Sequence, residues 1–200
     1  MYISLGSIES RYCVGVENLY RAYSANGSRH IKTNWYGDAL TDCQCIATHY
    51  NLSTEIVVAV VAVLSPSIRW HSNLDAACQC IAAFRSGSHP DNTKLSGWPA
   101  NKRKAFAILA KADPSLLSGR KVCAFASNIL GCESTVTVDR HMIHLYLYGA
   151  NGEPSGKLTV GKSAYGLIAS AISECANQIG IEPTRFQSIV WQAQAARKAF

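Results

Sequence analysis

Two side chains, those of Lys121 and Asp139, could do chemistry together. A lysine amine becomes a nucleophile when its pKa is lowered, and Schiff-base chemistry requires such an amine. A carboxylate beside it can stabilise a developing cation and shuttle protons. The same two residues also fit a purely structural explanation, in which Lys121 is a solvated lysine at a helix start and Asp139 is a helix N-cap.

The segment around these residues predicts a glycine turn, a helix, a β-branched stretch and a second helix. Gly119 permits the backbone of a sharp turn, and Gly131 is a natural helix stop. Residues 135–138 are too β-branched to prolong the helix comfortably, and they bring Asp139 to the positive end of the next helix dipole. Apolar residues at helical spacing predict one buried face, made of Val122, Ala126, Ile129 and Leu130.

The sequence LSGRKVCAFASNILG, followed by VTVDRH, resembles the helix-hairpin-helix DNA glycosylases, the superfamily of endonuclease III and 8-oxoguanine DNA glycosylase. The resemblance implies that Lys121 is the Schiff-base lysine of bifunctional members and Asp139 the catalytic aspartate. His141 would be the histidine of the family's Val-Asp-x-His segment. The hairpin at residues 116–119 is shorter than the family's Leu-Pro-Gly-Val-Gly type and lacks its proline and second glycine, which bears on how firmly it would anchor a phosphate.

A second match is the segment from Leu64 to Asn73, which resembles the loop that follows the central helix in this family. That loop pushes a side chain into the duplex where the target base leaves. Core packing is the alternative for Trp70, His144 and Tyr146. The resemblance implies a set of wedge or base-pocket residues, from this loop and from the helix after Asp139: Pro66, Ser67, Ile68, Trp70, His141, His144 and Tyr146.

Basic residues gather just before the hairpin. Lys102, Arg103 and Lys104 are consecutive, and such a run is either a solvated face or a contact for the DNA backbone. The hairpin, residues 116–120, would hold a phosphate with backbone N–H groups at a helix start. The net charge of +6 and the sequence pI of 8.9 favour a polyanionic partner. The expected DNA contacts are Arg69, Lys102, Arg103, Lys104, Ser118, Gly119 and Arg120.

The length and hydropathy of the chain limit its class. A chain of 200 residues suits one domain or two small lobes with an ample core. No basic run followed by an apolar core marks a signal sequence at the N-terminus. The longest apolar run, Ile56–Leu64, is far too short to span a bilayer. We therefore expect a soluble, cytoplasmic monomer that acts on DNA and not on a membrane.

The eight cysteines include two Cys-x-Cys pairs, both inside helical patterns. Residues i and i+2 of a helix point to different faces, and zinc usually requires a wider gap within each pair. Endonuclease III-type enzymes carry four cysteines for an iron–sulfur cluster near the C-terminus, whereas only Cys175 lies beyond Cys132 here. We therefore expect no metal and no cofactor, and we interpret the thiols as small buried apolar groups.

The apolar periodicity predicts an all-α fold of about eight to ten helices. Residues 56–64 are apolar on every side, as in a helix at the centre of a domain, and Ser53 begins a capping pattern before them. A buried strand is the alternative there. One lobe is expected to hold residues 35–130 and the other residues 1–34 and 131–200, with a cleft between them. The other helices are expected at residues 7–23 with Ser7 as the cap, 34–49, 74–85, 101–112, 140–148, 162–179 and 183–199.

The function implied by the resemblance is that of a DNA glycosylase, which flips a modified base out of the duplex and excises it. Lys121 would add Schiff-base lyase activity at the abasic site. Three alternatives remain at this point: a monofunctional glycosylase that uses water as the nucleophile, a DNA base-modifying transferase of the same fold, of the phage hypermodification type, and a non-catalytic DNA-binding module.

Overall fold

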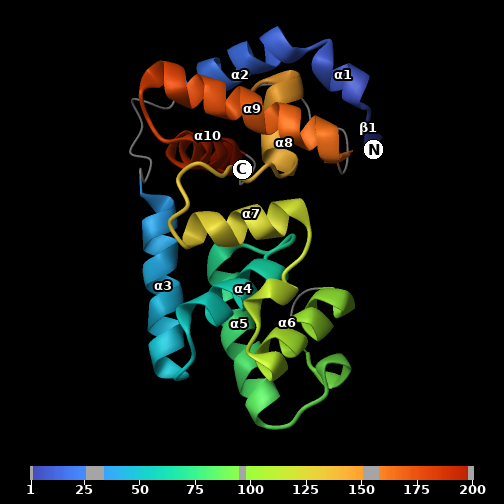
Figure 1. The fold of residues 1–200 in the computed structure, drawn as a ribbon, viewed down its shortest axis with the longest axis vertical. Helices are drawn as coiled ribbons and strands as arrows, with labels where there is room; N and C mark the ends of the chain where they lie inside the picture. The colour runs from blue at the N-terminus through green and yellow to red at the C-terminus, as the bar shows by residue number, and fades with distance from the viewer. Residues whose placement is uncertain (1, 26–33, 95–97, 151–157, 198–200) are drawn as a thin grey trace. The chain divides into compact units, whose positions relative to one another are not determined.

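The computed structural model describes residues 2–25, 34–94, 98–150 and 158–197 (Figure 1). In these ranges it contains ten α-helices, two short 3-10 helices and two strands of two residues each. The predicted all-α class is therefore confirmed. The chain forms two compact units, one made of Met1–Trp35 and Cys132–Phe200 and the other of Tyr36–Gly131. We call them the terminal unit and the central unit. That together they make a glycosylase-like domain stays a prediction.

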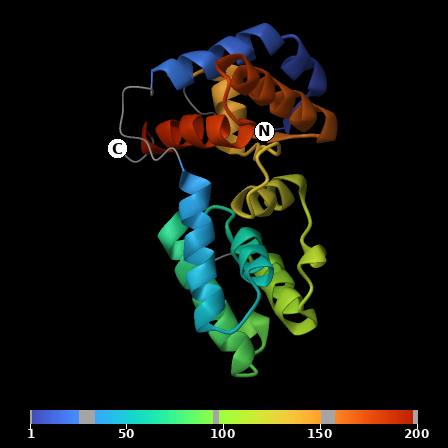
Figure 2. The ribbon, with the colours of Figure 1, turned by 60° about the vertical axis from the view of Figure 1, so that its left-hand side comes forward.

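The central unit is built around α4 (Thr54–Leu64), whose residues from Ile56 to Leu64 are all buried. The Ser53 hydroxyl caps this helix by accepting the backbone N–H of Ile56 at 3.3 Å. The prediction of a central helix, and not a strand, is confirmed. Around α4 pack α5 (Trp70–Arg85), α6 (Pro99–Lys111) and α7 (Arg120–Ile129) (Figure 2). Before α4 comes α3 (Trp35–His49).

Among the described residues, one bent pair of helices has the length and composition of a membrane span. No single helix there is long and apolar enough to cross a bilayer. The pair α3 and α4 reaches the required length and composition together, with a bend of 116° at the break between them.

The terminal unit joins both ends of the chain. Its helices are α1 (Leu5–Glu9), α2 (Tyr12–Ser24), α8 (Arg140–Tyr148), α9 (Lys162–Ile179) and α10 (Pro183–Arg197), and α2 packs against α8, α9 and α10 (Figure 1). The strand β1 (Tyr2–Ile3) pairs in parallel with β2 (Thr159–Val160). At the centre lies Tyr146, fully buried, whose hydroxyl donates to the carbonyl oxygen of Ile8 at 3.0 Å.

Two details of the helical prediction are wrong in the terminal unit. The first predicted helix is broken in two, because Arg11 leaves the helical conformation and its guanidinium donates to the carbonyl oxygen of Leu147 at the end of α8 (3.2 Å). The N-cap is Ser4 and not Ser7, since the Ser4 hydroxyl accepts the backbone N–H of Ser7. The predicted end of the last helix, residues 198–199, lies outside the described residues.

Three further differences concern the central unit. Helix α5 begins at Trp70 and not at residue 74, because the extended conformation ends at its N-cap Arg69, with φ of −71° and ψ of 153°. Helix α6 begins at Pro99 and not at Asn101, because proline suits the first helical position, where no N–H is needed. Leu130 is 44 % exposed and does not belong to the buried face of α7. The reason is that α7 ends at Ile129 and Leu130 is its C-cap, followed by Gly131 with a φ of 92°. The predicted glycine stop is confirmed.

Gly15 in α2 provides a test of the packing in the terminal unit. A Cβ added there would lie 2.6 Å from Cδ2 of Tyr146, whose ring is fully buried. We expect Gly15→Ala to lower the free energy of unfolding by about 1–3 kcal/mol, because the buried ring cannot retreat and overpacking outweighs the gain in helix propensity. Urea denaturation followed by circular dichroism measures this change.

The matched control is Gly166 in α9, where an added Cβ would meet nothing within 4 Å. Gly166→Ala should raise the free energy of unfolding by about 0.5–1 kcal/mol through helix propensity alone. Equal effects of the two substitutions would contradict the close approach of Gly15 to Tyr146.

Candidate functional site

The Asp139 carboxylate is held at the start of α8 by three N–H donors. Its Oδ1 accepts the backbone N–H groups of His141 at 2.9 Å and Met142 at 3.1 Å. Its Oδ2 accepts the indole N–H of Trp191 in α10 at 3.0 Å. Asp139 is only 9 % exposed, and a carboxylate at a helix N-terminus is favoured by the helix dipole. The predicted position of Asp139 as an N-cap is confirmed, and its catalytic role stays a prediction.

Trp191 is the residue at this carboxylate that sequence reasoning missed. A tryptophan in a predicted helix is typical of core packing, and nothing local indicates that its N–H reaches a residue 52 positions away. Its ring lies near that of Trp35, with centroids 5.7 Å apart, and the ring of His141 meets it nearly at right angles at 6.1 Å. The indole is therefore fixed from two sides.

The other predicted pocket residues of α8 have different surroundings. His144 is 1 % exposed, and its Nδ1 lies 3.2 Å from Nε2 of Gln194 in α10. His141 is half-buried. Tyr146 lies in the core described above, in agreement with the packing alternative for this residue. A role for His141 and His144 in binding a base stays a prediction.

Lys121 lies in the central unit, at the second position of α7. The chain reaches it from α6 through a 3-10 helix, η2 (Pro114–Leu116), and a turn at Gly119. Gly119 has a φ of 94°, which side-chain-bearing residues rarely adopt, and an added Cβ there would meet nothing within 4 Å. The turn thus needs a glycine for its backbone conformation and not for space. No side chain caps α7 at Gly119, and Arg120, its first residue, is exposed.

Lys121 and Asp139 belong to different units of the structure. Lys121 is half-buried in the central unit, whereas Asp139 is buried in the terminal unit. Their action on one substrate stays a prediction.

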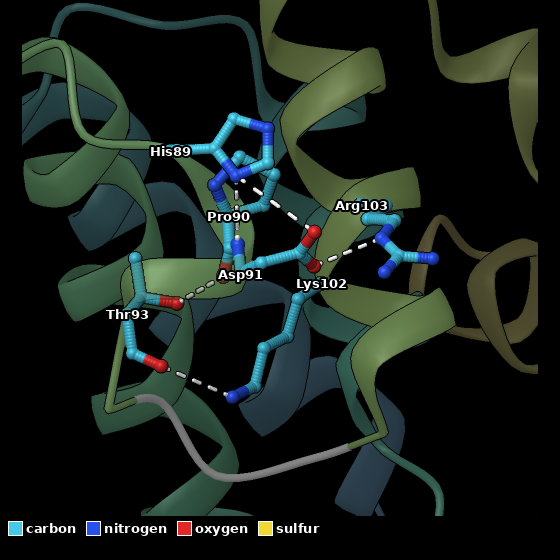
Figure 3. A network of polar contacts seen from close by, with 6 residues as sticks. All are labelled: His89, Pro90, Asp91, Thr93, Lys102 and Arg103. Carbon is cyan, nitrogen blue, oxygen red and sulfur yellow. Dashed lines mark hydrogen bonds and ion pairs between the residues drawn. The ribbon is translucent and has the colours of Figure 1, made fainter.

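The basic cluster, Lys102 to Lys104, is tied to its own unit by three contacts. The ammonium of Lys102 donates to the carbonyl oxygen of Thr93 at 3.2 Å, and Nε of Arg103 donates to Oδ1 of Asp91 at 2.8 Å (Figure 3). The ammonium of Lys104 donates to the hydroxyl of Ser118 in the hairpin. Each of the three side chains thus has a partner in the central unit, and Arg103 remains 62 % exposed.

The partner of Arg103 sits in a short 3-10 helix, η1 (Pro90–Asn92). The hydrogen bond from Arg103 lowers the pKa of the Asp91 carboxyl, because it favours the charged form. The Nδ1 of His89 accepts the backbone N–H of Asp91 at 3.3 Å and caps η1 (Figure 3). None of the helices predicted from the sequence covers residues 90–92, because contacts of this kind leave no periodic signal.

The candidate wedge loop connects α4 to α5. Ser67 and Arg69 are exposed, whereas Pro66 and Ile68 are half-buried. Ser67 has a φ of 69°, an uncommon conformation for a residue other than glycine. Strained residues of this kind cluster at functional sites, which makes this loop a candidate for contacts with a ligand.

Trp70, the first residue of α5, points into the central unit. Its indole N–H donates to Oδ2 of Asp42 in α3 at 2.9 Å. The ring of Phe125 in α7 lies edge-on to it, with centroids 6.4 Å apart. This environment agrees with the packing alternative for Trp70, and it leaves Ser67 and Arg69 as the exposed members of the loop.

The cysteines differ from the expectation of buried thiols. Burial raises the pKa of Cys43, Cys80 and Cys175 to about 12, as expected for inert core groups. Cys13 and Cys45, by contrast, are exposed. No group of three or more His, Cys, Asp or Glu side chains within the described ranges could hold a metal ion.

Cys132 was not singled out by its sequence context. Hydrogen bonds with the hydroxyls of Thr135 and Ser134 lower its pKa to about 7. This half-buried thiol is therefore partly ionised at neutral pH, unlike the three buried cysteines.

Comparison with known proteins places the whole chain in one family. No curated protein and no solved structure matches the sequence. A family model matches residues 7–199, which cover nearly all of both units. Its description is "Family of unknown function (DUF7178)". The chain therefore belongs to the DUF7178 family.

Proposed function

We propose that the protein is a DNA glycosylase that flips a modified base out of duplex DNA, cleaves its N-glycosidic bond, and cleaves the strand through a Schiff base. The observation that carries this proposal is the Asp139 carboxylate, buried and oriented by three N–H donors at the start of α8. The segment that contains it resembles the Val-Asp-x-His segment of helix-hairpin-helix glycosylases. A fixed, buried charge of this kind suits the stabilisation of a cationic transition state.

In the proposed reaction Asp139 acts on the sugar. When the N-glycosidic bond breaks, the base leaves with the bonding electron pair, and positive charge develops on the sugar as in glycoside hydrolysis. The carboxylate stabilises this charge. Its effect is greater in a buried environment than in water, because the local dielectric constant is lower.

Lys121 is the proposed nucleophile. Its neutral amine forms a bond to the sugar carbon that loses the base, and the amine releases a proton. Opening of the sugar ring then gives an imine between the lysine and the sugar. Loss of the phosphate on the 3′ side by elimination breaks the strand, and hydrolysis of the imine restores the amine.

The central unit would supply the contacts to the DNA backbone. The N-cap of α7 is Gly119, which has no side chain, and backbone N–H groups at a helix start favour phosphate. The cations of residues 102–104 come before this hairpin in the sequence and are connected to it by the bond between Lys104 and Ser118. Phosphate contacts position a protein on a duplex without reading its sequence.

Incubation with duplex oligonucleotides, each carrying one modified base, tests the function. Gel analysis after alkali reveals base loss, gel analysis without alkali reveals lyase activity, and mass spectrometry identifies the products. We expect base loss and strand cleavage for at least one modified base. A base of altered mass that stays attached to the DNA would instead indicate a transferase, and affinity without turnover on any member of the panel would indicate a binding module.

Charge reversal at Lys102 and Lys104 tests the proposed DNA-binding surface. The double variant Lys102→Glu/Lys104→Glu should weaken binding to all duplex sequences alike, and the slope of log K against log salt should fall by about two, since each phosphate contact contributes about 0.9. Fluorescence anisotropy at several salt concentrations measures both effects.

Lys162→Glu is the matched control for this prediction. Lys162 is an exposed lysine at the start of α9 in the terminal unit, and it is not among the proposed contacts. Charge reversal at Lys162 should leave the salt dependence of DNA binding unchanged. Affinity unaffected by the double variant would show that residues 102–104 form only a solvated face.

A further inference from the structure

Helix α10 has an unusual buried side, and this side meets the proposed catalytic acid. Gln187, Ser188 and Gln194 are each less than 4 % exposed, although they are polar. Trp191 lies at helical spacing from them and donates to Asp139. Ser188 donates to the carbonyl oxygen of Arg185 at 2.9 Å, and Nε2 of Gln194 lies 3.2 Å from Nδ1 of His144. This side of α10 therefore carries hydrogen-bonded polar groups beside the Asp139 carboxylate, which makes its residues candidates for a functional role.

We propose that Trp191 is a positioning residue that fixes the Asp139 carboxylate in its reactive orientation. This inference rests on the proposed glycosylase function. It goes beyond that function because it identifies the reactive oxygen atom of the carboxylate and the residue that orients this carboxylate.

The hydrogen bonds at Asp139 leave one acceptor position for the reaction. An ionised carboxylate has four lone-pair sites, two on each oxygen. In the described part of the chain, Oδ1 accepts two backbone N–H groups, from His141 and Met142. Oδ2 accepts one, from Trp191. The remaining site lies on Oδ2, which we therefore assign as the oxygen that faces the sugar.

Trp191 determines where this site points. The two backbone donors hold only Oδ1, so without the indole the carboxylate could rotate about its Cβ–Cγ bond. The indole has a single N–H donor and no acceptor, and its own ring is fixed by Trp35 and His141. A donor held in this way orients the acid before the substrate binds, which is the role of the third group in a catalytic arrangement. Misplacement of a reactive group by about 1 Å can cost about 100-fold in rate.

The test compares Trp191→Phe with Trp35→Phe. The first variant removes the donor and keeps a ring, whereas the second disturbs the packing around Trp191 and keeps the donor. With enzyme in excess over a cleavable duplex, Trp191→Phe should lower the single-turnover rate of base release by about 10- to 100-fold. The dissociation constant for the same duplex should stay unchanged. Trp35→Phe keeps the N–H donor and weakens only the packing on the indole, so it should lower the rate by less than Trp191→Phe.

Two further measurements do not depend on the folding of Trp191→Phe. In protein labelled with ¹⁵N in tryptophan, the indole N–H signal of Trp191 should shift in Asp139→Asn and stay in place in Asp113→Asn, a change at another helix-capping aspartate. Asp139→Glu keeps the charge but moves the carboxylate away from the indole, so base release should fall as in Trp191→Phe.

The outcomes separate this inference from the proposed function. The positioning role would be overturned by a wild-type rate of base release in Trp191→Phe or Asp139→Glu, or by an indole signal that does not respond to Asp139→Asn. In each of these cases, base release by the wild-type protein would still support the glycosylase function. Absence of base release by the wild-type protein would refute the glycosylase function, and the catalytic role of Trp191 with it, even if the indole signal showed that the bond exists.

Discussion

Replacement of Asp139 with asparagine is expected to lower base release by about 1,000-fold, comparable with the loss of a preorganised stabilising group in other enzymes. Asparagine has the same shape but no negative charge, so the cation that develops on the sugar loses its counter-charge. The binding of duplex DNA should be unchanged or tighter, since a carboxylate near phosphates repels them. Single-turnover assays and anisotropy titrations on the same preparation measure both effects.

The local structure should largely survive this substitution. Asparagine is a good N-cap, and its oxygen can still accept the N–H groups of His141 and Met142. Its amide N–H₂ would then face the N–H of Trp191, so one hydrogen bond is lost at a cost of about 1 kcal/mol. A thermal unfolding scan checks that the loss of activity is not a loss of fold.

The matched control for Asp139→Asn is Asp113→Asn. Asp113 caps η2 by accepting the backbone N–H of Ser115 at 2.9 Å, so the control removes the charge of a capping aspartate outside the proposed site. It should leave base release unaltered. Base release by Asp139→Asn at the wild-type rate would exclude Asp139 as the catalytic acid.

Lys121→Gln is expected to eliminate the covalent protein–DNA adduct that borohydride traps. The adduct requires an imine, and glutamine has no amine that can form one. If Lys121 is also the nucleophile for base release, the rate of base release falls sharply in the same variant. Denaturing gel electrophoresis of borohydride-treated reactions detects the adduct, and the glycosylase assay gives the rate.

The control is Lys111→Gln, at the exposed end of α6, and this variant should still form the adduct that borohydride traps. Continued trapping by Lys121→Gln would show that another amine forms the imine. Base release near the wild-type rate without trapping would show that water is the nucleophile and that the enzyme is monofunctional.

Those features of the fold that depend on neighbouring residues were predictable from the sequence. The central helix α4 could be recognised because Ser53 supplies its cap and every following side is apolar. The end of α7 follows from Gly131, and the start of α8 from the capping preference of Asp139. Each of these signals lies within a few residues of the boundary that it determines.

The features that the sequence did not predict depend on contacts between distant segments. The break between α1 and α2 involves the bond from Arg11 to the end of α8. The sequence left the core position of Tyr146 open as one of two alternatives, and this position depends on the close approach of Gly15. The environment of Asp139 depends in the same way on Trp191. Helical periodicity indicates which side of a helix is buried, but not which distant donor reaches a given acceptor.

The most direct test of the central claim is the quantity of free base released into solution, measured by mass spectrometry for the wild-type protein and Asp139→Asn side by side. The substrates are duplexes that each carry one modified base. We predict that the wild-type protein releases the free base from at least one duplex and that Asp139→Asn releases about 1,000-fold less per unit time. No free base from any duplex with the wild-type protein, or equal quantities from the two proteins, would contradict the claim that Asp139 drives the excision of a base.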